Sequence, residues 1–359
     1  MKRIRICHVV CDITGGGVES VLLNYFSHMD RSNYELDLVT YDIKSNLCAD
    51  RFRALGFNII TVPPKREGFG KSVASMSHVI KNGHYDVVHA HLTEWNCIPV
   101  GLAWVHRVEK RISHSHMADS AGGFRKQVLF AAQKWLNKRF ATKLCACGEE
   151  AGIYLYGRKL YETGRVEILN NAIETDRFEP NLLIRENIRK MLHLSEEIFC
   201  VGHVGRFLPQ KNHLFLVDIF AEILKVRPQS CLILLGQGEL EEKVHEKVKA
   251  SGIEAKVKFL GVRDDISQIY QAMDVFCLPS LFEGFPVSAI EAQAAQLPCI
   301  ISDRVSEKIK ITENVRLCSL SQSAGDWAKV MMEVKGKACK LPPEYNIENM
   351  AAKWDRLYL

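Results

Sequence analysis

Short apolar, β-branched runs alternate with longer amphipathic stretches along most of the chain, and this alternation constrains the fold more than any other feature. Near-continuous apolar strands separated by helix-length segments are typical of parallel sheets covered by helices on both faces. The runs expected to form strands are RIRICHVV, YELDLVTY, FNIITV, DVVHAH, KRISHSH and KLCAC in the first half, and IFCVGHVG, SCLILLGQG, VKFLG, DVFCLPS and PCIIS in the second. The sequence therefore predicts an α/β fold in which each half is a Rossmann-like, doubly wound domain.

The chain length favours two such domains, because 359 residues exceed what one hydrophobic core usually serves. A polar, turn-rich stretch, NNAIETDRFEPN, follows the apolar run VEILN and is expected to hold the boundary. We expect an N-terminal domain over residues 1–172, a C-terminal domain over 173–345, and a helix over 346–359 that could return to the N-terminal domain. Since ligands of open α/β sheets bind at the carboxyl ends of the strands, the two domains are expected to face a central cleft.

Composition excludes several other classes of protein. Hydrophobic residues make up 47% and charged residues 25%, as in ordinary soluble domains, and no apolar run approaches the roughly 20 residues of a membrane-spanning helix. The start, MKRIRICHVVCDITGGG, has too short an apolar core for a signal peptide and is expected to be a strand. The twelve cysteines lack zinc-like spacing, so free, buried thiols in a reducing cytoplasm are expected.

Three loops that follow expected strands carry features suited to a phosphate or a sugar. The first, TGGGVES, opens a helix expected from Val18, where glycines allow close backbone approach and free N–H groups favour an anion. The dinucleotide fingerprint GxGxxG is absent. A glycine-rich turn after a first strand is common, so phosphate contact and a purely structural turn both stay open.

The second loop lies in VGHVGRFLPQKNH, where Arg206 and Lys211 follow a strand that ends at Gly205. Two cations beside a cleft suit a diphosphate, and an arginine can bind it through two parallel hydrogen bonds. The alternative is an exposed loop with two solvated charges.

The third loop leads into EGFPVSAIE, residues 283–291. Pro286 is expected at the first position of a helix, where its missing N–H costs nothing, and the N–H groups of residues 287–289 would be available to an anion. Glu283 precedes this helix, and Glu291 lies about 7.5 Å further along its axis. The two carboxylates are therefore too far apart to act on one atom, and their separation matches the length of a sugar nucleotide.

Taken together, these segments resemble family 4 of the retaining glycosyltransferases, which have the GT-B fold. The resemblance rests on TGGGVES, DVVHAHLTEW, VGRFLPQKN, LLGQGELEEKV, VKFLGVRDDI and MDVFCLPSLFEGFPVSAIEAQAAQLPCIISD, and it covers about residues 4 to 305. More narrowly, RISHSHMADS, CACGEEAG and SLSQSAGDWA resemble bacterial exopolysaccharide and capsule-type members.

The resemblance implies roles for residues on the donor side. Arg206 and Lys211 would hold the two phosphates and stabilise the departing nucleoside diphosphate. Glu283 would bond hydroxyls of the transferred sugar, Glu291 would bond the ribose, and the loop at residues 262–263 would contact the base. The whole donor-binding set implied is Gly16, Gly17, Arg206, Lys211, Val262, Arg263, Glu283, Gly284, Phe285, Pro286, Val287 and Glu291.

The resemblance also implies a histidine close to the donor sugar. The HSH run offers His114 and His116, and the position of KRIS favours His116 without excluding His114. His89 and His91 are expected on the acceptor side together with His114. A lone histidine is more often structural, whereas two at one strand end favour a site. The catalytic set implied is His116, Arg206, Lys211 and Glu283.

The chemistry implied is a front-face substitution in which the donor phosphate helps to take the acceptor proton. Cations and helix N-termini suit a diphosphate leaving group, whereas glycosidases place two carboxylates around one bond. GT-B enzymes typically need no bound metal, and no Asp-x-Asp at an expected strand end contradicts this. We therefore expect no cofactor and no metal, only a nucleotide-sugar donor; a UDP-sugar is favoured and GDP stays open.

Residues 101–143 hold nine Lys/Arg against two Asp/Glu. Within them, FRKQVLFAAQKWLNKRF at 124–140 predicts a helix that can lie on an anionic membrane; the alternative is a core-packed helix with a solvated face. Polymer-building members of the resembled family use polyprenyl-diphosphate-linked acceptors, which favours membrane contact. The expected apolar face is Val128, Ala131, Ala132, Trp135 and Leu136, and the basic residues mainly elsewhere are Arg125, Lys126, Lys134, Lys138 and Arg139.

The sequence thus predicts a cytoplasmic enzyme, peripheral at the inner face of the plasma membrane, with no nucleic-acid partner. It would move a sugar from a UDP-sugar to a polyprenyl-diphosphate-linked or oligosaccharide acceptor in exopolysaccharide, capsule or O-antigen synthesis. Two alternatives keep the fold: a UDP-sugar 2-epimerase and a catalytically silent nucleotide-sugar-binding protein. A nicotinamide-dependent oxidoreductase is disfavoured, because GGGVE lacks both the fingerprint and its acidic ribose ligand.

Overall fold

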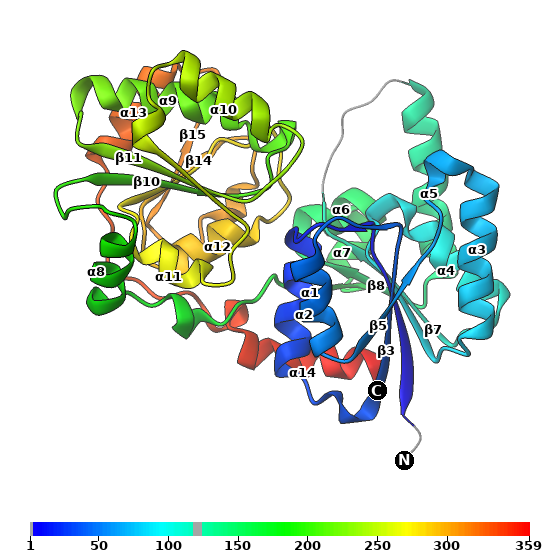
Figure 1. The fold of residues 1–359 in the computed structure, drawn as a ribbon. Coiled ribbons are helices and arrows are strands. Elements are labelled where there is room, and N and C mark those ends of the chain that lie inside the picture. Colours follow the sequence, from blue (N-terminus) through cyan, green and yellow to red (C-terminus); the bar gives the residue numbers. More distant parts are fainter. Residues whose placement is uncertain (1–2, 118–123) are drawn as a thin grey trace. The chain divides into compact units, whose positions relative to one another are not determined.

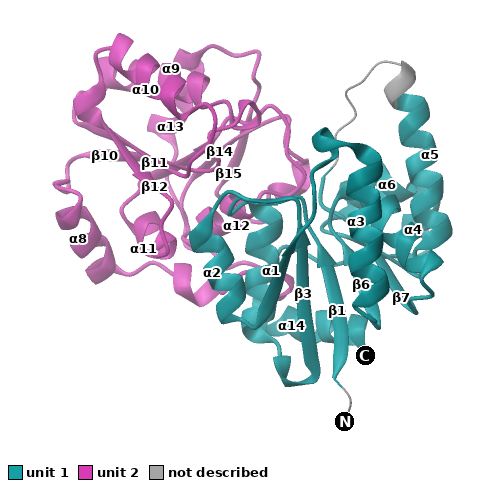
Figure 2. Ribbon diagram, turned by 45° about the vertical axis from the view of Figure 1, so that its right-hand side comes forward, with its two compact units in different colours: residues 1–172, 347–359 teal, residues 173–346 magenta. Residues whose placement is uncertain are grey.

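The polar stretch after the run VEILN is where the chain passes from one structural unit to the next. The computed structural model describes residues 3–117 and 124–359, with side chains throughout except at 124–126. The chain divides into unit 1, residues 1–172 together with 347–359, and unit 2, residues 173–346 (Figures 1 and 2). The sequence predicts these divisions at 172/173 and 345/346. The first prediction agrees with the structure, and the second division lies one residue later than predicted. Each unit has its own parallel sheet and its own core.

Unit 1 is built on a parallel sheet whose strand order, in the described part of the chain, is β5-β3-β1-β6-β7-β8-β9. The chain moves outward from β1 to β3 and β5 on one side and to β6 on the other, so β1 marks the topological switch point. The strands are β1 (Ile4–Val9), β3 (Tyr34–Thr40), β5 (Phe57–Thr61), β6 (Val87–Ala90), β7 (Lys110–Ser115), β8 (Lys143–Ala146) and β9 (Val166–Ile168), with β2 (Asp12–Ile13) and β4 (Asp42–Ile43) paired separately.

Helices cover both faces of the unit 1 sheet. Helices α1, α2 and α14 pack together on one face, and α3, α4, α5 and α6 follow one another on the other. The C-terminal helix belongs to this unit because Trp354 stacks on Tyr25 of α1, with ring centroids 4.3 Å apart. The helices are α1 (Gly17–His28), α2 (Asn46–Ala54), α3 (Phe69–Asn82), α4 (Cys97–Val105), α5 (Phe124–Phe140), α6 (Glu149–Tyr156), α7 (Arg158–Glu162) and α14 (Ile347–Tyr358).

Unit 2 repeats the doubly wound plan, with strand order β12-β11-β10-β13-β14-β15 among its described residues and β10 at the switch point. Helices α9, α10 and α13 bury apolar side chains against one face, and α8, α11 and α12 lie on the other (Figure 1). The strands are β10 (Phe199–Val204), β11 (Ser230–Leu235), β12 (Val257–Gly261), β13 (Val275–Leu278), β14 (Cys299–Ser302) and β15 (Val315–Cys318). The helices are α8 (Leu182–Met191), α9 (His213–Val226), α10 (Glu241–Ala250), α11 (Ile266–Gln271), α12 (Val287–Ala294) and α13 (Ala324–Glu333).

The predicted fold class is confirmed, since each expected apolar run forms a strand of a parallel sheet covered on both faces. The edge strand β15 was not expected, because its run VRLC is short and carries an exposed Arg316. All twelve cysteines are free thiols, ten of them buried, with Cys11 exposed and Cys339 half-buried. Within the described ranges, every helix is too short or too polar to cross a bilayer.

Candidate functional site

The loop after β10 holds its two cations at the switch point of the unit 2 sheet. Lys211 ends a short 3₁₀ helix (Pro209–Lys211), and Asn212 takes a left-handed φ of +55° so that α9 can begin at the next residue. Asparagine tolerates this conformation better than most residues. Arg206, near the start of the loop, is half-buried. Both cations therefore lie at the carboxyl end of the strand from which the sheet is wound in both directions.

Lys211 and Glu283 form an ion pair across two neighbouring loops. Lys211 Nζ lies 2.6 Å from Glu283 Oε1, and the two side chains are only 14% and 10% exposed. Ser280 Oγ donates a second hydrogen bond to the same carboxylate at 3.1 Å. Charge-assisted bonds of this kind are stronger when they are shielded from water. The carboxylate expected to hold a sugar and the cation expected to hold a phosphate are thus fixed beside each other.

Hydrogen bonds from side-chain amides to backbone carbonyls also tie the two loops together. Asn212 Nδ2 donates to the Pro279 carbonyl at 3.1 Å, and Gln210 Nε2 donates to the Phe282 carbonyl at 3.0 Å. These bonds join the loops after β10 and β13, which are adjacent strands of the sheet. The ion pair is consequently carried on a braced backbone.

The turn GQG after β11 supports the same loop from the other side. Phe207 N–H donates to the Gln237 carbonyl at 3.0 Å. Gly236 has φ +130°, and a Cβ at this position would lie 2.1 Å from the carbonyl oxygen of Gly205. Only glycine fits here without a shift of the backbone. In the sequence this turn contributed to the family resemblance alone, and its bracing role was missed.

Helix α12 begins one residue later than expected. Pro286 is the N-cap, with φ −69° and ψ 122°, and Val287 is the first helical residue, so the prediction of Pro286 at the first helical position is wrong. The N–H of Ala289 donates to the Pro286 carbonyl at 3.1 Å, so its predicted availability is also wrong. The N–H groups of Val287 and Ser288 lie in the first turn, where the helix itself provides no acceptor. Two of the three backbone N–H groups predicted to be available to an anion therefore remain so, those of Val287 and Ser288.

Glu291 lies on the fifth residue of α12 beside a buried tyrosine. The Tyr270 hydroxyl donates to Glu291 Oε2 at 3.0 Å, and it also lies 3.0 Å from the Ser288 carbonyl. Burial raises the pKa of the Glu291 carboxyl to about 7, while the tyrosine hydrogen bond opposes this rise. Shifted pKa values of this kind are frequent at functional sites.

The remaining residues of unit 2 that were predicted to bind the donor lie in the loops after β12 and β13. Arg263 lies after β12 and bonds both oxygens of Asp265 at 2.7 Å, which fixes its guanidinium, while Val262 is 41% exposed. Phe285 stacks on Tyr345 with ring centroids 5.9 Å apart. Gly284, beside Phe285, is half-buried. Among Val262, Arg263, Gly284 and Phe285, Val262 is the most accessible to a ligand.

Two buried histidines beneath Lys211 were missed by sequence reasoning. His203 on β10 and His213 at the start of α9 have ring centroids 4.6 Å apart, and His203 Nδ1 donates to the Cys277 carbonyl at 2.8 Å. Burial lowers the pKa of His203 to about 3 and that of His213 to about 2, and the charge of Lys211 adds to the effect. Both rings are therefore neutral near pH 7 and add no cation beside Lys211.

In unit 1, the glycine-rich turn after β2 is held by a buried acid. Helix α1 begins at Gly17, one residue before the expected Val18, with Gly16 as its N-cap. Glu19 is 5% exposed and accepts hydrogen bonds from the backbone N–H of Thr14 at 2.8 Å and from its hydroxyl at 3.1 Å. Gly16 is buried, whereas Gly17 is exposed. Glu19 thus stabilises the turn, and Gly17 is the glycine that a ligand could approach.

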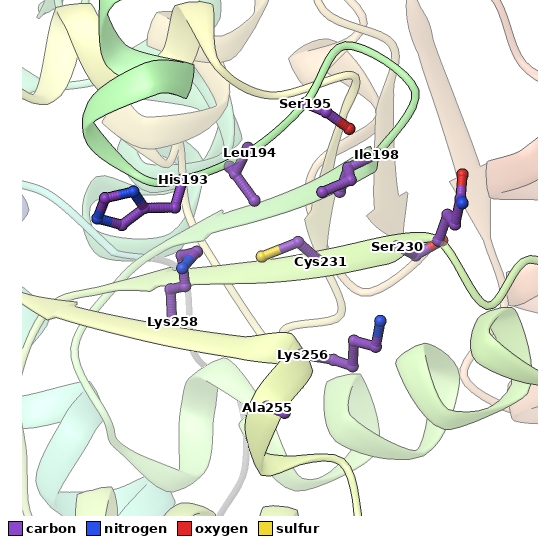
Figure 3. Close-up of a pocket in the computed structure, with 10 residues that line it drawn as sticks. His193, Leu194, Ser195, Ile198, Ser230, Cys231, Ala255, Lys256 and Lys258 are labelled. Atoms are coloured by element: carbon purple, nitrogen blue, oxygen red, sulfur yellow. The ribbon is translucent and has the colours of Figure 1, made fainter.

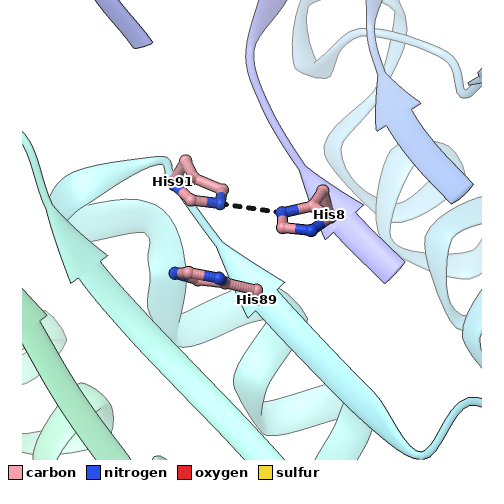
Figure 4. A group of neighbouring side chains, drawn as sticks. All are labelled: His8, His89 and His91. Atoms are coloured by element: carbon pink, nitrogen blue, oxygen red, sulfur yellow. Dashed lines mark hydrogen bonds between the residues drawn. The ribbon is translucent and has the colours of Figure 1, made fainter. Parts of the chain in front are cut away.

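The four predicted histidines of unit 1 converge on one face of the sheet, and a fifth joins them. His8 pairs in register with His89 on the next strand, and the H-x-H spacing keeps both histidines of each pair on this face. His91 Nε2 lies 3.1 Å from His8 Nδ1 (Figure 4), and its Nδ1 lies 2.9 Å from His116 Nε2. His89 Nε2 lies 3.2 Å from His114 Nδ1. These five residues are called the histidine cluster below.

The histidine cluster is closed from below by aromatic side chains and is neutral. The Tyr358 hydroxyl lies 2.9 Å from His89 Nδ1, and Trp354 of the same helix packs on His89 with centroids 5.5 Å apart. Burial lowers the pKa of every member, to about 3 for His8 and His116, and the neighbouring rings oppose a second charge. His116 alone among the five keeps partial exposure. It is therefore the member that a ligand could reach.

Helix α5 places its polar side chains inward. Gln133 and Asn137 are buried, and the Asn137 side chain accepts from Ser113 Oγ and donates to the Glu94 carbonyl. Of the expected apolar face, Trp135 is 61% exposed, Val128 is 56% exposed, and Ala131 and Ala132 are exposed, while Leu136 is half-buried. Most of the expected apolar face is therefore open to solvent, while α5 packs on its neighbours through other residues, as the alternative of a core-packed helix with a solvated face allows. The side chains of Arg125 and Lys126 lie outside the described residues.

A cavity of about 210 Å³ lies at the other end of the unit 2 strands (Figure 3). It is lined by the first residues of β11 and β12, among them Ser230, Cys231 and Lys258, together with His193 and Ser195. Because the strands are parallel, this cavity is separated from the Lys211–Glu283 pair by the length of the sheet. It is not part of the candidate site.

Comparisons with known proteins agree with this architecture. The model of the family described as Glycosyl transferases group 1 matches residues 184–334, and that of Glycosyltransferase Family 4 matches residues 15–177. The putative glycosyltransferase EpsF of Bacillus subtilis (strain 168) is 34% identical over 341 residues, which span 91% of this chain and 86% of that protein. A second relative, the UDP-Gal:alpha-D-GlcNAc-diphosphoundecaprenol alpha-1,3-galactosyltransferase of Escherichia coli, is 28% identical over 321 residues, spanning 84% and 80% of the two chains.

Among solved structures, that of Anabaena HepE in complex with UDP-glucose superposes with a TM-score of 0.76. The match covers 98% of this chain and 95% of HepE at 20% sequence identity. At this identity, the match establishes the shared fold.

Proposed function

Because this chain belongs to the GT-B glycosyltransferases, we propose that it moves a sugar from a UDP-sugar, with retention of configuration, to a lipid-linked or nascent surface polysaccharide. The observation that carries the proposal is the ion pair of Lys211 and Glu283, 2.6 Å apart at the switch point of unit 2. A cation suited to a diphosphate is held there beside a carboxylate suited to sugar hydroxyls. The galactosyltransferase relative, named for a diphosphoundecaprenol acceptor, and HepE, solved with UDP-glucose, support this choice of substrates.

Leaving-group stabilisation is the main task that the geometry supports. When the bond between the anomeric carbon and the phosphate oxygen breaks, the electron pair leaves with the nucleoside diphosphate. Arg206 and Lys211 would offset that charge from a braced loop that needs no reorganisation. The acceptor hydroxyl would attack from the same face, and its proton would pass to the departing phosphate oxygen. These fixed cations would stabilise the diphosphate in place of a metal ion, so we propose a reaction that needs no metal ion.

Glu283 and Glu291 would orient the donor at its two ends. Glu283 is already bonded by Lys211 and Ser280, and its remaining acceptor positions suit hydroxyls of the transferred sugar. Glu291 holds one bond from Tyr270 and would accept from the ribose. In unit 1, His116 would present a ring nitrogen to the donor sugar, with His89, His91 and His114 behind it toward the acceptor. The exposed Val262 and the fixed Arg263 would contact the base.

The exposed surface of α5 supports docking on the inner leaflet of the plasma membrane. Apolar side chains that face solvent, among them Val128, Leu129 and Trp135, lie on the same helix as the exposed cations Lys138 and Arg139. Buried apolar area and attraction to anionic lipid together hold such helices at an interface. Peripheral attachment would bring the enzyme to a polyprenyl-diphosphate-linked acceptor.

One assay separates the proposed reaction from its alternatives. The purified protein is incubated with a panel of UDP- and GDP-sugars, with and without a polyprenyl-diphosphate-linked sugar in anionic vesicles. The proposal expects an extended lipid product from a UDP-sugar, with the anomeric configuration of the donor retained on NMR. Interconversion of the UDP-sugar without acceptor would identify the 2-epimerase instead. Saturable UDP binding without turnover on any acceptor would identify a silent binding protein.

A further inference from the structure

The histidine cluster contains more imidazole nitrogens at close range than sugar transfer requires. We propose that His91, His114 and His116 form an inhibitory binding site for a late transition-metal ion such as Zn²⁺. The binding part of this inference is independent of the proposed function, whereas the inhibition rests on it.

The spacing of the nitrogen atoms fits an ion bound by three imidazoles. One ring nitrogen from each of the three histidines lies within 4.8 Å of those from the other two, and His91 Nδ1 is 2.9 Å from His116 Nε2. Zinc–nitrogen bonds of about 2.0–2.1 Å place two ligand atoms of a tetrahedron roughly 3.3 Å apart. Small rotations of the rings would therefore bring all three to bonding distance.

Each buried ligand has its second nitrogen already bonded. His91 Nε2 bonds His8 Nδ1 at 3.1 Å, and His114 Nδ1 bonds His89 Nε2 at 3.2 Å. Metal-ligating histidines almost always engage a partner through the nitrogen that faces away from the ion, because this fixes the ring and its tautomer. His8 and His89 would serve as these partners. The arrangement leaves His91 Nδ1 and His114 Nε2 to face the ion.

His114 Nε2 gives a second, independent reason to place a ligand here. It is buried and has no hydrogen-bond partner, although its ring is held by His89 through the other nitrogen. An unpartnered buried nitrogen costs about 1–3 kcal/mol, and a bound ion would remove that cost. Burial keeps the His114 ring neutral, and neutral imidazole is the form that binds zinc, copper and nickel. The proton shared between His91 Nδ1 and His116 Nε2 would leave to solvent or move to the other nitrogen of the His116 ring when the ion binds.

Solvent access favours the set of His91, His114 and His116 over a second set of histidines beside it. His8, His89 and His91 (Figure 4) also bring ring nitrogens within 4.8 Å of one another, but all three side chains are buried. The set proposed here includes the half-exposed His116, which offers an entry path and an open fourth position. An ion in this position would hold the His116 ring, which is proposed to contact the donor sugar, through Nε2. Transfer would slow when the ion binds.

The test measures metal binding to the intact chain. The protein is first treated with a chelator and dialysed; Zn²⁺ binding is then measured by calorimetry, and Co²⁺ binding by the visible absorption spectrum. We expect one ion per chain and a Co²⁺ spectrum without the near-ultraviolet thiolate band that a cysteine ligand would give. His91→Gln or His114→Gln should weaken Zn²⁺ binding at least 100-fold, and His89→Gln by about 10–100-fold as a partner of a ligand. The exposed His245→Gln in unit 2 is the matched control and should bind as the wild type does.

Three results would overturn the site. The first is the absence of a stoichiometric ion on the wild type, and the second is a thiolate band in its Co²⁺ spectrum. The third is loss of Zn²⁺ binding in His8→Phe together with unchanged Zn²⁺ binding in His114→Gln, which would assign the ion to His8, His89 and His91. A far-ultraviolet circular dichroism spectrum and a cooperative unfolding transition like those of the wild type show that each variant is folded. Bound Zn²⁺ that leaves the transfer rate unchanged would overturn the inhibition. A wild type that binds Zn²⁺ but transfers no sugar would overturn the proposed function and leave the site standing.

Discussion

Lys211 Nζ lies 2.6 Å from Glu283 Oε1, so residues 72 positions apart form one ion pair at the ends of two adjacent strands. The pair is nearly enclosed, and Ser280 adds a further bond to the carboxylate. Lys211 is thereby held in place before any diphosphate arrives. Pre-organised charge of this kind stabilises a leaving group without a reorganisation cost during the reaction.

The first prediction concerns the two cations of the loop. Arg206→Ala and Lys211→Ala should each lower turnover by at least about 100-fold, the scale on which loss of one charge-stabilising donor acts. Lys249→Ala, an exposed lysine on α10, is the matched control and should leave turnover unchanged. The measurement is the steady-state transfer rate at saturating donor. Near-normal rates in both loop variants would remove the phosphate assignment.

The second prediction is a pH dependence that Glu291 gives to donor binding. Burial raises the pKa of its carboxyl to about 7, so the group becomes protonated as the pH falls below that value. A carboxylate accepts ribose hydroxyl bonds better than the neutral acid. UDP affinity should therefore fall between pH 8 and pH 6 in the wild type and stay flat in Glu291→Gln. Because the Tyr270 hydroxyl lowers this pKa, Tyr270→Phe should move the transition to higher pH.

The same carboxyl has an opposite effect on stability. A raised pKa means that the folded chain binds this proton more tightly than the unfolded chain, whose value is 4.5. Stability from this group is therefore greatest at low pH and declines as the pH rises from about 4.5 through about 7. Glu291→Gln should raise the melting temperature by a few degrees at pH 8 and leave it unchanged near pH 4. A lower melting temperature at pH 8 would show that the carboxylate is well solvated instead.

Much of the fold could be predicted because apolar runs determine which segments become buried parallel strands. The pairing of Lys211 with Glu283 could not, since it depends on β10 and β13 being neighbours, and sequence spacing does not encode strand order. His8 was missed because one histidine in RIRICHVV looks like an ordinary strand residue. Two H-x-H runs on successive strands were the available signal that histidines gather on one face. The inward polar stripe of α5 depends on Ser113 and the Glu94 carbonyl as its partners, which no helical periodicity reveals.

The third prediction isolates the contact that braces the cation loop. Gly236→Ala should destabilise unit 2 by about 1–3 kcal/mol and weaken UDP binding, because its Cβ would meet the Gly205 carbonyl at 2.1 Å. Gly252→Ala is the matched control, since Gly252 also has a positive φ, +67°, but nothing lies within 4 Å of its added Cβ. It should cost stability through the backbone alone and spare UDP binding. Equal loss of UDP affinity in both variants would contradict the bracing role.

The fourth prediction concerns removal of divalent metal. EDTA should leave the transfer rate intact or raise it, because Arg206 and Lys211 are proposed to supply the charge that offsets the diphosphate. The measurement is turnover in chelated buffer compared with buffer containing Mg²⁺ or Mn²⁺. A strict requirement for either ion would contradict the metal-independent reaction.

The last prediction tests α5 as a membrane contact. Each basic residue near an anionic surface contributes about 1 kcal/mol, so Lys134→Gln together with Lys138→Gln should weaken binding to phosphatidylserine vesicles roughly 30-fold. Trp135→Ser should weaken it further by removing a ring that is 61% exposed. Both changes should spare UDP affinity, because UDP is proposed to bind in unit 2. Lys243→Gln with Lys249→Gln on α10 removes the same charge from another exposed helix and is the matched control. Co-sedimentation measures the binding, and equal loss in the α5 and α10 variants would show a general effect of net charge instead of a docking helix.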